Sequence, residues 1–283
     1  MSQSGYRGPE SDGKSGTDEP IYRIPRFARC ALDVVGQSLT VLYEDETFIV
    51  IDKPEGVHTA PLTDGEPDTL QALVLSAFPE IAAVPGVKPF EHGLLHRLDR
   101  STSGVVVVAR TPAAFAALRA QFSSEQVRKE YRAACVGRSG RISEEKFSVT
   151  SRFAPAGSGR RMVRVVMPDE TNRKLLGKAT RRDYTTEANI ISREGNRALL
   201  GVVIRKGFRH QVRAHLSCAG WPIIGDELYG VAIGRGAPAP LVQRRLYLHA
   251  IAVSLTHPVT GQPLRIVSPL PETFTTVISS RSG

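Results

Sequence analysis

The sequence predicts an α+β fold, in which several short strands and a few helices share one domain. Four consecutive valines at 105–108 are typical of a strand that is buried on both faces. Apolar and charged side chains alternate over 127–136, as expected for a further strand. Residues 208–219 instead place apolar side chains at helical spacing, and Gly220 supplies a stop signal. Strands and helices are therefore both expected.

The first expected elements are two strands and two helices. Residues 41–44 and 48–52 are rich in β-branched and aromatic side chains around a polar turn, which predicts a pair of strands. A short amphipathic helix is expected over 70–78. Another helix follows the valine strand, because Thr111 can cap its start and Pro112 suits the first helical position.

The alternating segment 127–136 is expected to be a half-buried strand. Its apolar face would contain Val127, Tyr131, Ala133 and Cys135, and its polar face Arg128, Glu130 and Arg132. This alternation directs the Tyr131 side chain into the protein. On periodicity alone, Tyr131 is an ordinary core aromatic residue.

The segment that follows is basic and rich in turns. Residues 157–161 and 169–178 are expected to be mobile loops, with a strand over 162–167 between them. A hairpin formed by 188–192 and 198–204 is expected next, because two apolar runs flank a glycine-containing turn.

Positive charge is concentrated in one part of the chain. The 283 residues carry a net charge of +9, with 41% hydrophobic and 23% charged residues, as in ordinary soluble proteins. Residues 141–213 contain 17 Lys and Arg against 7 Asp and Glu, whereas the remainder contains 20 against 21. Such a basic surface favours binding of a polyanion, above all nucleic acid. A basic surface that serves only solubility is the alternative.

Cysteine usage and hydropathy indicate a reducing, cytoplasmic environment. The three scattered cysteines form no Cys-x-x-Cys pair, so they suggest neither a disulfide framework nor a structural zinc site. Apolar runs are far shorter than the roughly 20 residues that span a bilayer. The N-terminal residues lack the apolar core of a signal peptide. We therefore expect no membrane association.

The chain is expected to form one domain between two tails. Residues 1–22 are rich in Ser, Gly and charged side chains and have little to bury, which predicts a disordered polar tail. A single domain is expected over 23–278, and a short tail over 279–283.

One stretch concentrates charged side chains directly before a rigid element. Residues 96–104, HRLDRSTSG, run straight into the valine strand. Loops attached to a rigid scaffold often carry catalytic groups, so Asp99 is a candidate catalytic carboxylate. A solvated charge cluster at the start of a strand is the alternative, and other parts of the chain have to decide between the two.

Several stretches, taken in order, resemble the RluA class of pseudouridine synthases. HRLDRSTSG matches the signature of that family, which is far more specific than a lone glycine motif. The resemblance covers roughly residues 41–271. The other matching stretches are VLYEDETFIVIDKPEGV for the opening hairpin, KEYRAACVG for a lysine-x-tyrosine strand, HQVRAHLSCAGWPIIGDELYG for a helix-loop block, and LYLHAIAVSLTHPVTGQPL for the closing strand pair.

The resemblance implies a catalytic domain with a mixed, mainly antiparallel sheet that isomerises uridine to pseudouridine in structured RNA, either ribosomal or transfer RNA. In this reaction uracil leaves its ribose, rotates and rejoins it through a ring carbon, without a cofactor or a metal ion. Asp99 would be the catalytic carboxylate, as nucleophile or as base, and Arg213 would pair with it. Tyr131 would stack on the target base and help to move a proton. A monomer is expected.

The resemblance also implies contacts with RNA. Arg97 occupies the family position whose side chain enters the RNA stack where the target nucleotide leaves. Arg97 and Arg100, together with Arg213, would favour the charged form of Asp99. The small upstream RNA-binding domain of some members is not expected here, so RNA selection would rest on the catalytic domain. The residues expected to bind RNA are His96, Arg97, Arg100, Arg160, Arg161, Arg209, His210 and Gln211.

One departure from the family pattern lies before the His-Gln-x-Arg motif. The family has glycine-arginine-threonine there, whereas this chain has Gly207, Phe208 and Arg209. In a helical turn, Arg209 would be displaced by about 100°. It would then contact an RNA phosphate, or Phe208 would change the wall of the pocket.

Two functions from other classes remain as alternatives. A non-catalytic RNA-binding or RNA-chaperone protein could retain the fold and lack turnover. A hydrolase that uses Asp99 and His96 on a phosphoester would need metal ligands. The sequence contains no HExxH motif, and His210 and His215 would lie about 140° apart around a helix, which does not suit one shared metal ion.

Overall fold

The computed structural model describes residues 30–34, 37–61, 66–88, 90–138, 144–230 and 245–279. The tail expected over 1–22 lies outside these residues, as do 280–283. Ser279 belongs to the last helix, which therefore extends one residue beyond the expected domain boundary.

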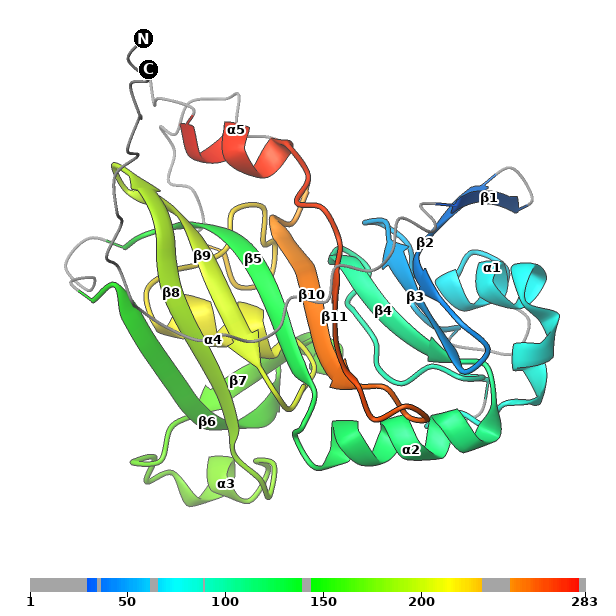
Figure 1. Ribbon diagram of the computed structural model, residues 1–283. Helices are drawn as coiled ribbons and strands as arrows, with labels where there is room; N and C mark the ends of the chain where they lie inside the picture. The colour runs from blue at the N-terminus through cyan, green and yellow to red at the C-terminus, as the bar shows by residue number, and fades with distance from the viewer. Residues whose placement is uncertain are drawn as a thin grey trace, which may run out of the picture.

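In the described part of the chain, eleven strands form one sheet, which is the body of the fold (Figure 1). The order is β1-β2-β3-β4-β10-β5-β9-β8-β6-β7, and β11 pairs with β10 beside this path. Among the described residues, only β4 and β10 pair in parallel, so the mixed, mainly antiparallel sheet and the α+β class are confirmed. The strands are β1 (Cys30–Val34), β2 (Gln37–Glu44), β3 (Phe48–Lys53), β4 (Ser103–Ala109), β5 (Arg128–Val136), β6 (Lys146–Ala156), β7 (Met162–Val166), β8 (Tyr184–Glu194), β9 (Arg197–Ile204), β10 (Leu248–Thr256) and β11 (Pro263–Val267).

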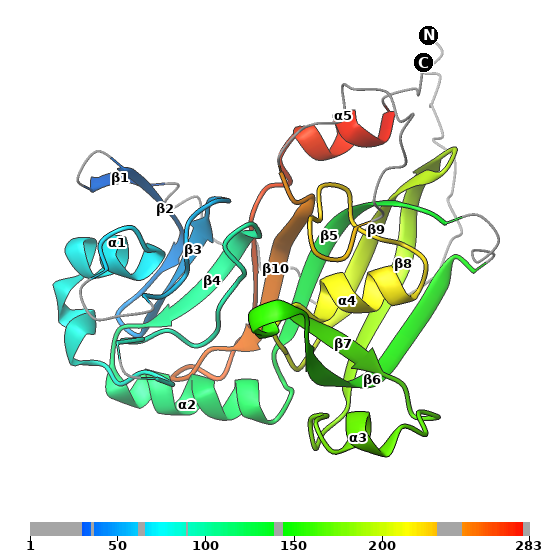
Figure 2. The same ribbon diagram turned by 180° about the vertical axis from the view of Figure 1, so that it is seen from behind.

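The helices pack on different parts of this sheet. Helix α1 packs on β1 and β2, and α2 packs on β4, whereas α4 lies next to β7 and β8 (Figure 2). No helix in the described ranges is long and apolar enough to cross a membrane. The helices are α1 (Leu70–Ala77), α2 (Pro112–Ser123), α3 (Arg173–Leu176), α4 (Gln211–Cys218) and α5 (Thr273–Ser279), with short 3-10 helices at Pro79–Ala83 and Ser158–Arg160.

The capping and turn signals read from the sequence are present. Thr111 Oγ1 accepts a hydrogen bond from the Ala114 amide at 3.1 Å, and α2 begins at Pro112. Gly195 has a φ of 59° in the hairpin between β8 and β9, and Gly220 has a φ of 88° after α4. These elements are therefore correctly predicted, with boundaries that differ by a few residues.

The sheet divides where β4 meets β10. These two strands are paired only at Ser103 with His249 and at Gly104 with Ala250. Farther along β10, its neighbour is β11 instead. Gly104 has a φ of 110°, and a Cβ atom there would lie only 2.2 Å from the carbonyl oxygen of Ala250. Glycine is thus required at this crossing, which brings the loop before β4 up to the centre of the sheet.

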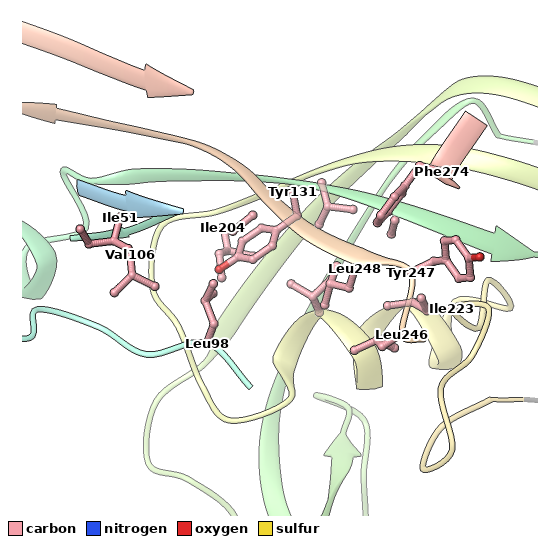
Figure 3. Close-up of a cluster of buried hydrophobic side chains, with 14 of the residues drawn as sticks. Ile51, Leu98, Val106, Tyr131, Ile204, Ile223, Leu246, Tyr247, Leu248 and Phe274 are labelled. Carbon is pink, nitrogen blue, oxygen red and sulfur yellow. The ribbon is translucent and has the colours of Figure 1, made fainter. Parts of the chain in front are cut away.

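The core lies on both faces of the sheet around β4. All seven residues of β4 are buried, as the valine run predicts. Val106 and Val108 belong to a large apolar cluster that also contains Tyr131 and Leu98, part of which is drawn in Figure 3. The other two valines of the run pack with the apolar side chains of α2. Two packed faces make β4 a rigid support for the loop that precedes it.

The expectation that β5 is half-buried is wrong. This strand lies between β10 and β9 in the middle of the sheet, so both of its faces are covered. Even Glu130 is only 7% exposed, because it accepts hydrogen bonds from Arg128 at 2.7 Å and from Arg265 at 3.0 Å. The expectation that Tyr131 points inward is confirmed.

The basic region contains more regular structure than its sequence predicts. Strand β6 escapes prediction because its buried face includes the polar Ser151, which bonds to His215. Residues 173–176, expected as part of a loop, form the short helix α3, and the Asn172 side chain accepts from the Leu175 amide at 3.1 Å. Helix α4 begins three residues later than predicted, because His210 has a left-handed φ of 57°.

Asp45, in the turn between β2 and β3, predicts acid sensitivity. Burial alone would raise its pKa, but hydrogen bonds from Thr47, Tyr43, Phe48 and His257 outweigh burial and lower the pKa from 3.8 to about 2. A carboxylate of this kind stabilises the folded state above its unfolded pKa, and the contribution is lost as the pH falls toward the folded pKa. We therefore expect the free energy of unfolding to decrease between about pH 4 and pH 2.

Urea unfolding at a series of pH values measures this effect. Asp45→Asn is expected to lower stability at neutral pH and to flatten the pH dependence in the acid range. Identical pH slopes for the two proteins would contradict the prediction.

Candidate active site

The loop that carries Asp99 is anchored on both sides of that residue. Lys53, at the end of β3, is fully buried, and its Nζ donates to the carbonyl oxygens of Pro54, Val57 and Arg100 at 2.7, 2.8 and 3.2 Å. Burial lowers the pKa of Lys53 to about 8, although the carboxylates of Asp99 and Glu55 oppose this shift. An ammonium group thus ties the turn after β3 to the loop.

A second anchor lies on the other side of Asp99. The Thr59 hydroxyl donates to the carbonyl oxygen of Leu98 at 2.8 Å and accepts from the amide of Leu98 at 3.1 Å. The amide of Thr102 also donates to the carbonyl oxygen of Asp99 at 3.0 Å, which closes a turn directly before β4. The backbone on each side of Asp99 is therefore fixed, and its carboxylate occupies a defined position.

Arg213, on α4, connects Asp99 to a second carboxylate. Its Nε and Nη2 donate to the two oxygens of Asp226 at 2.8 Å each, and its Nη1 donates to Asp99 Oδ2 at 3.0 Å. Asp226 has no exposed side-chain area and also accepts from the amides of Leu228 and Tyr229. Burial would lower the pKa of Arg213, but Asp226 and then Asp99 outweigh burial and raise it. Asp226 thus orients a permanently charged guanidinium group toward Asp99.

His210 approaches the same oxygen of Asp99. Its Nε2 lies 3.8 Å from Asp99 Oδ2, and its Nδ1 lies 3.1 Å from the Tyr229 hydroxyl. That hydroxyl accepts from the Val163 amide at 2.8 Å, so its own proton is available for His210 Nδ1. Burial and the neighbouring guanidinium groups lower the pKa of His210, although Asp99 opposes them. The imidazole of His210 is therefore held between the Tyr229 hydroxyl and the carboxylate of Asp99.

Tyr131 lines the same cleft from β5. Its side chain extends from the strand toward Leu98, the residue before Asp99 (Figure 3). Burial, and then the charge of Asp99, raise the pKa of the Tyr131 hydroxyl. The hydroxyl is therefore neutral over the whole physiological range. The loop before β4, helix α4 and strand β5 thus place the carboxylate of Asp99, the guanidinium group of Arg213 and the phenol of Tyr131 in one cleft.

The cleft around these groups is strongly basic. It has a volume of about 570 Å³ and lies at the point where the sheet divides, between the loop before β4 and the start of α4. Two carboxylates, those of Glu91 and Asp99, face nine basic side chains in its lining. Such a surface attracts a polyanion. The nine basic residues are Lys88, Arg97, Arg100, Arg119, Lys129, Arg182, Lys206, Arg209 and Arg213.

Comparison with known proteins identifies the family of this chain. A family model described as RNA pseudouridylate synthase matches residues 47–218. Ribosomal large subunit pseudouridine synthase D of Xanthomonas campestris is 34% identical over 249 residues, which cover 86% of this chain and 69% of that protein. The chain belongs to the RNA pseudouridylate synthase family. It is therefore an isomerase that acts on RNA and forms pseudouridine.

Further matches agree with this membership. Ribosomal large subunit pseudouridine synthase D of Pseudomonas aeruginosa is 33% identical over 248 residues, covering 85% of this chain and 71% of that protein. The solved structure of human RNA pseudouridylate synthase domain containing 4 superposes with a TM-score of 0.59 at 25% identity, covering 83% of this chain and 90% of that one. The pseudouridine synthase fold inferred from the sequence motifs is confirmed.

Within this synthase, the two arginines next to Asp99 in sequence do not pair with it. Arg97 donates to Glu91 Oε1 at 3.1 Å, and Arg100 donates to the carbonyl oxygen of Gly56 at 2.8 Å. Their expected role in favouring the charged form of Asp99 is therefore not supported by a direct contact. Both side chains line the cleft, where Arg97 retains 47% of its side-chain surface exposed.

His96 and Gln211 hold local structure. His96 Nε2 accepts from the Val107 amide at 3.2 Å, and burial, with the charge of Lys129, lowers its pKa to about 3. Gln211 is buried; its Nε2 donates to the carbonyl oxygen of Thr185 at 2.9 Å, and its Oε1 accepts from Phe208. Gln211 therefore stabilises the turn before α4, and it also lines the cleft.

The departure at Phe208 and Arg209 has a structural explanation. The turn is not helical, and Arg209 donates to the carbonyl oxygens of Arg160 and Met162 at 2.7 and 3.2 Å. Phe208 stacks on Phe153 with ring centroids 5.0 Å apart. Arg209 thus joins the turn before α4 to the hairpin of β6 and β7, while Arg160 itself is exposed, as is Arg161.

No group of three or more metal-binding side chains occurs in the described ranges. His215 bonds to Ser151 and Thr186 at 2.8 Å, and His249 to Ser103 and Ser268 at 2.9 and 3.0 Å. Both ring nitrogens of each histidine are thus hydrogen-bonded to hydroxyl groups.

Four residues of the site are not singled out by the sequence: Lys53, Thr59, Asp226 and Tyr229. Lys53 lies in the opening-hairpin stretch, and Asp226 and Tyr229 lie in the helix-loop block, so the matched stretches contained the signal. Their roles depend on contacts that no local pattern specifies.

Proposed function

We propose that this enzyme isomerises uridine in RNA of the large ribosomal subunit and that Asp99 is its catalytic carboxylate. The observation that carries the proposal is the bond from Arg213 to Asp99 Oδ2 at 3.0 Å, beside Tyr131 in a basic cleft. The names of the two bacterial relatives, which refer to the large ribosomal subunit, support this choice of RNA.

The carboxylate is arranged so that one oxygen remains for chemistry. Arg213 donates a hydrogen bond to Oδ2 of Asp99, and His210 lies near the same oxygen. Oδ1 has no hydrogen bond from any described residue. In the reaction, the bond between the sugar and a ring nitrogen breaks and a bond from the sugar to a ring carbon forms. That carbon loses a proton and the nitrogen gains one, so the product is an isomer. Asp99 Oδ1 would act on the sugar or on the base, and Tyr131 would stack on the base.

Substrate RNA would be held by the basic cleft. Extrusion of a nucleotide from an RNA stack costs a few kcal/mol, which a planar cation in the vacated place offsets in part. Arg97 is suited to this role, because its exposed guanidinium group lies at the cleft and is oriented by the buried Glu91. Arg100, Arg160, Arg161 and Arg209 would add contacts to phosphates.

Mapping of pseudouridines tests the assignment. Large-subunit ribosomal RNA from cells that lack this protein is expected to lose one or more pseudouridines, and the purified protein is expected to restore them in that RNA. Loss from transfer RNA alone would refute the choice of ribosomal RNA. RNA that is bound but never modified would favour the RNA-chaperone function, and cleaved RNA would favour a hydrolase.

The proposal extends to the state of the protein. We expect a monomer in the cytoplasm that needs no added cofactor, because the isomerisation transfers no group to or from a second molecule. Size-exclusion chromatography with light scattering measures the mass, and activity after dialysis against a chelator measures metal dependence. A dimer, or activity that disappears with the chelator, would contradict this part.

Tyr131→Phe separates stacking from proton transfer. The substitution keeps the aromatic ring and removes the hydroxyl, so RNA affinity is expected to change little. If the hydroxyl takes part in proton transfer, kcat falls by about 10²-fold or more. Single-turnover kinetics on ribosomal RNA measures the rate. Tyr184→Phe, which removes a hydroxyl outside the cleft lining, is the control and should retain normal kcat; a normal kcat for Tyr131→Phe would limit Tyr131 to stacking.

A further inference from the structure

Lys129 is a buried lysine of the cleft that takes no part in the roles proposed for Asp99 and Tyr131. Lys129 lies on β5, two residues before Tyr131, so the two side chains emerge from the same face of the strand. The rise of a strand places their Cα atoms about 6.6 Å apart. Both residues line the cleft, although Lys129 is only 7% exposed.

The ammonium group of Lys129 is not paired with a carboxylate of the described part of the chain. Among the described residues, no hydrogen-bond acceptor or carboxylate is within bonding distance of its Nζ. The Nζ instead lies 5.7 Å from the centroid of the Phe122 ring, and a Cβ atom at Gly207 would be 3.2 Å from it. The Nζ of Lys129 therefore lies between the aromatic ring of Phe122 and the backbone of Gly207, at the edge of the cleft.

The surrounding charges add to the positive potential. Arg119 and Lys206 line the same end of the cleft. The nearby carboxylate of Glu125 is already bound by Lys206 at 3.0 Å. Burial, and then the charge of Arg119, lower the pKa of Lys129 to about 8, while Glu125 opposes them. A buried cation of this kind is costly unless an anion completes its site.

We propose that Lys129 binds a phosphate of the nucleotide whose base lies beside Tyr131. This inference rests on the proposed function, because it assumes that the target nucleotide enters this cleft. A base stacked at Tyr131 is joined through its ribose to phosphates, and Lys129, which has no bonded anion among the described residues, lies on the same face of β5 and lines the same cleft. Arg119 and Lys206 complete the electrostatic environment of the phosphate. Lys129 is thus a positioning residue, since it holds the nucleotide rather than the reacting bond.

The affinity of nucleotides for the intact protein tests this role without turnover. Uridine 5′-monophosphate, uridine 3′-monophosphate and uridine are titrated separately into the wild type, and binding is followed by NMR. At least one monophosphate is expected to bind more tightly than uridine. In Lys129→Met, this preference is expected to fall by about tenfold, the loss of one charge-assisted hydrogen bond.

Matched variants separate charge from folding. Arg128→Met also removes one positive charge from β5, but Arg128 is paired with Glu130 and does not line the cleft, so it should keep the preference. Lys129→Arg retains the charge and is expected to keep most of the preference for a monophosphate over uridine. If Lys129→Met has a lowered melting temperature, Lys129→Gln replaces it as the neutral variant.

Kinetics on ribosomal RNA provides the second readout. Lys129→Met is expected to raise KM with little change in kcat, and to reduce the slope of log affinity against log salt by about 1. Failure of the proposed function would appear as absent isomerisation of ribosomal RNA by the wild type, whereas the nucleotide titration would still report on Lys129. Three outcomes would overturn the inference: a wild type without preference for a monophosphate, a preference unchanged in Lys129→Met, or a loss confined to kcat.

Discussion

Asp99→Asn is expected to abolish pseudouridine formation, with a loss of about 10⁴-fold or more in the single-turnover rate. Asparagine keeps the shape of the side chain and can still accept the hydrogen bond from Arg213, but it supplies neither a nucleophilic nor a basic oxygen. The Asp99 side chain is 25% exposed, so the thermal stability should remain close to that of the wild type. RNA affinity should also be retained, because the basic lining of the cleft is unchanged.

The control for this prediction removes a carboxylate elsewhere. Asp183 is largely exposed, lies 4.0 Å from Arg152 and does not line the cleft. Asp183→Asn makes the same chemical change and should leave turnover within about twofold of the wild type. Turnover by Asp99→Asn within tenfold of the wild type would refute the catalytic role of Asp99.

Arg213→Met is expected to lower both stability and activity. It leaves the carboxylate of Asp226 buried without its cation, and loss of one partner from a buried ion pair costs about 3–5 kcal/mol. The substitution also removes the donor to Asp99 Oδ2. Chemical denaturation measures the change in the free energy of unfolding, and the single-turnover assay measures activity.

The double variant Arg213→Met with Asp226→Asn separates the two effects. Asparagine at 226 carries no charge and can still accept from the amides of Leu228 and Tyr229, so more than half of the lost stability should return. Activity should not return, because Asp99 still lacks its guanidinium partner. Recovery of activity together with stability would show that Arg213 serves folding alone.

Much of the fold follows from local patterns. The valine run predicts a strand buried on both faces, and β4 is such a strand because α2 covers one face and the large cluster around Tyr131 the other. Thr111 and Pro112 mark the start of α2, since a side-chain cap is a local interaction. The half-buried interpretation of β5 fails because burial depends on neighbouring strands, and the position of β5 between β10 and β9 is not encoded in its own alternation.

The active site shows the same division. The sequence by itself determined which segments are candidates for the chemistry, because Asp99, Tyr131 and Arg213 belong to short, specific motifs. Only the tertiary structure decided that Arg213, 114 residues away, reaches Asp99, whereas Arg97 and Arg100, within two residues of Asp99, bond elsewhere. The reason is geometric: directions of side chains are set by the backbone that holds them, and Lys53, Thr59 and Asp226 fix those directions through contacts between distant parts of the chain. Nearness in sequence places charges in one neighbourhood, but long-range packing selects which pair forms.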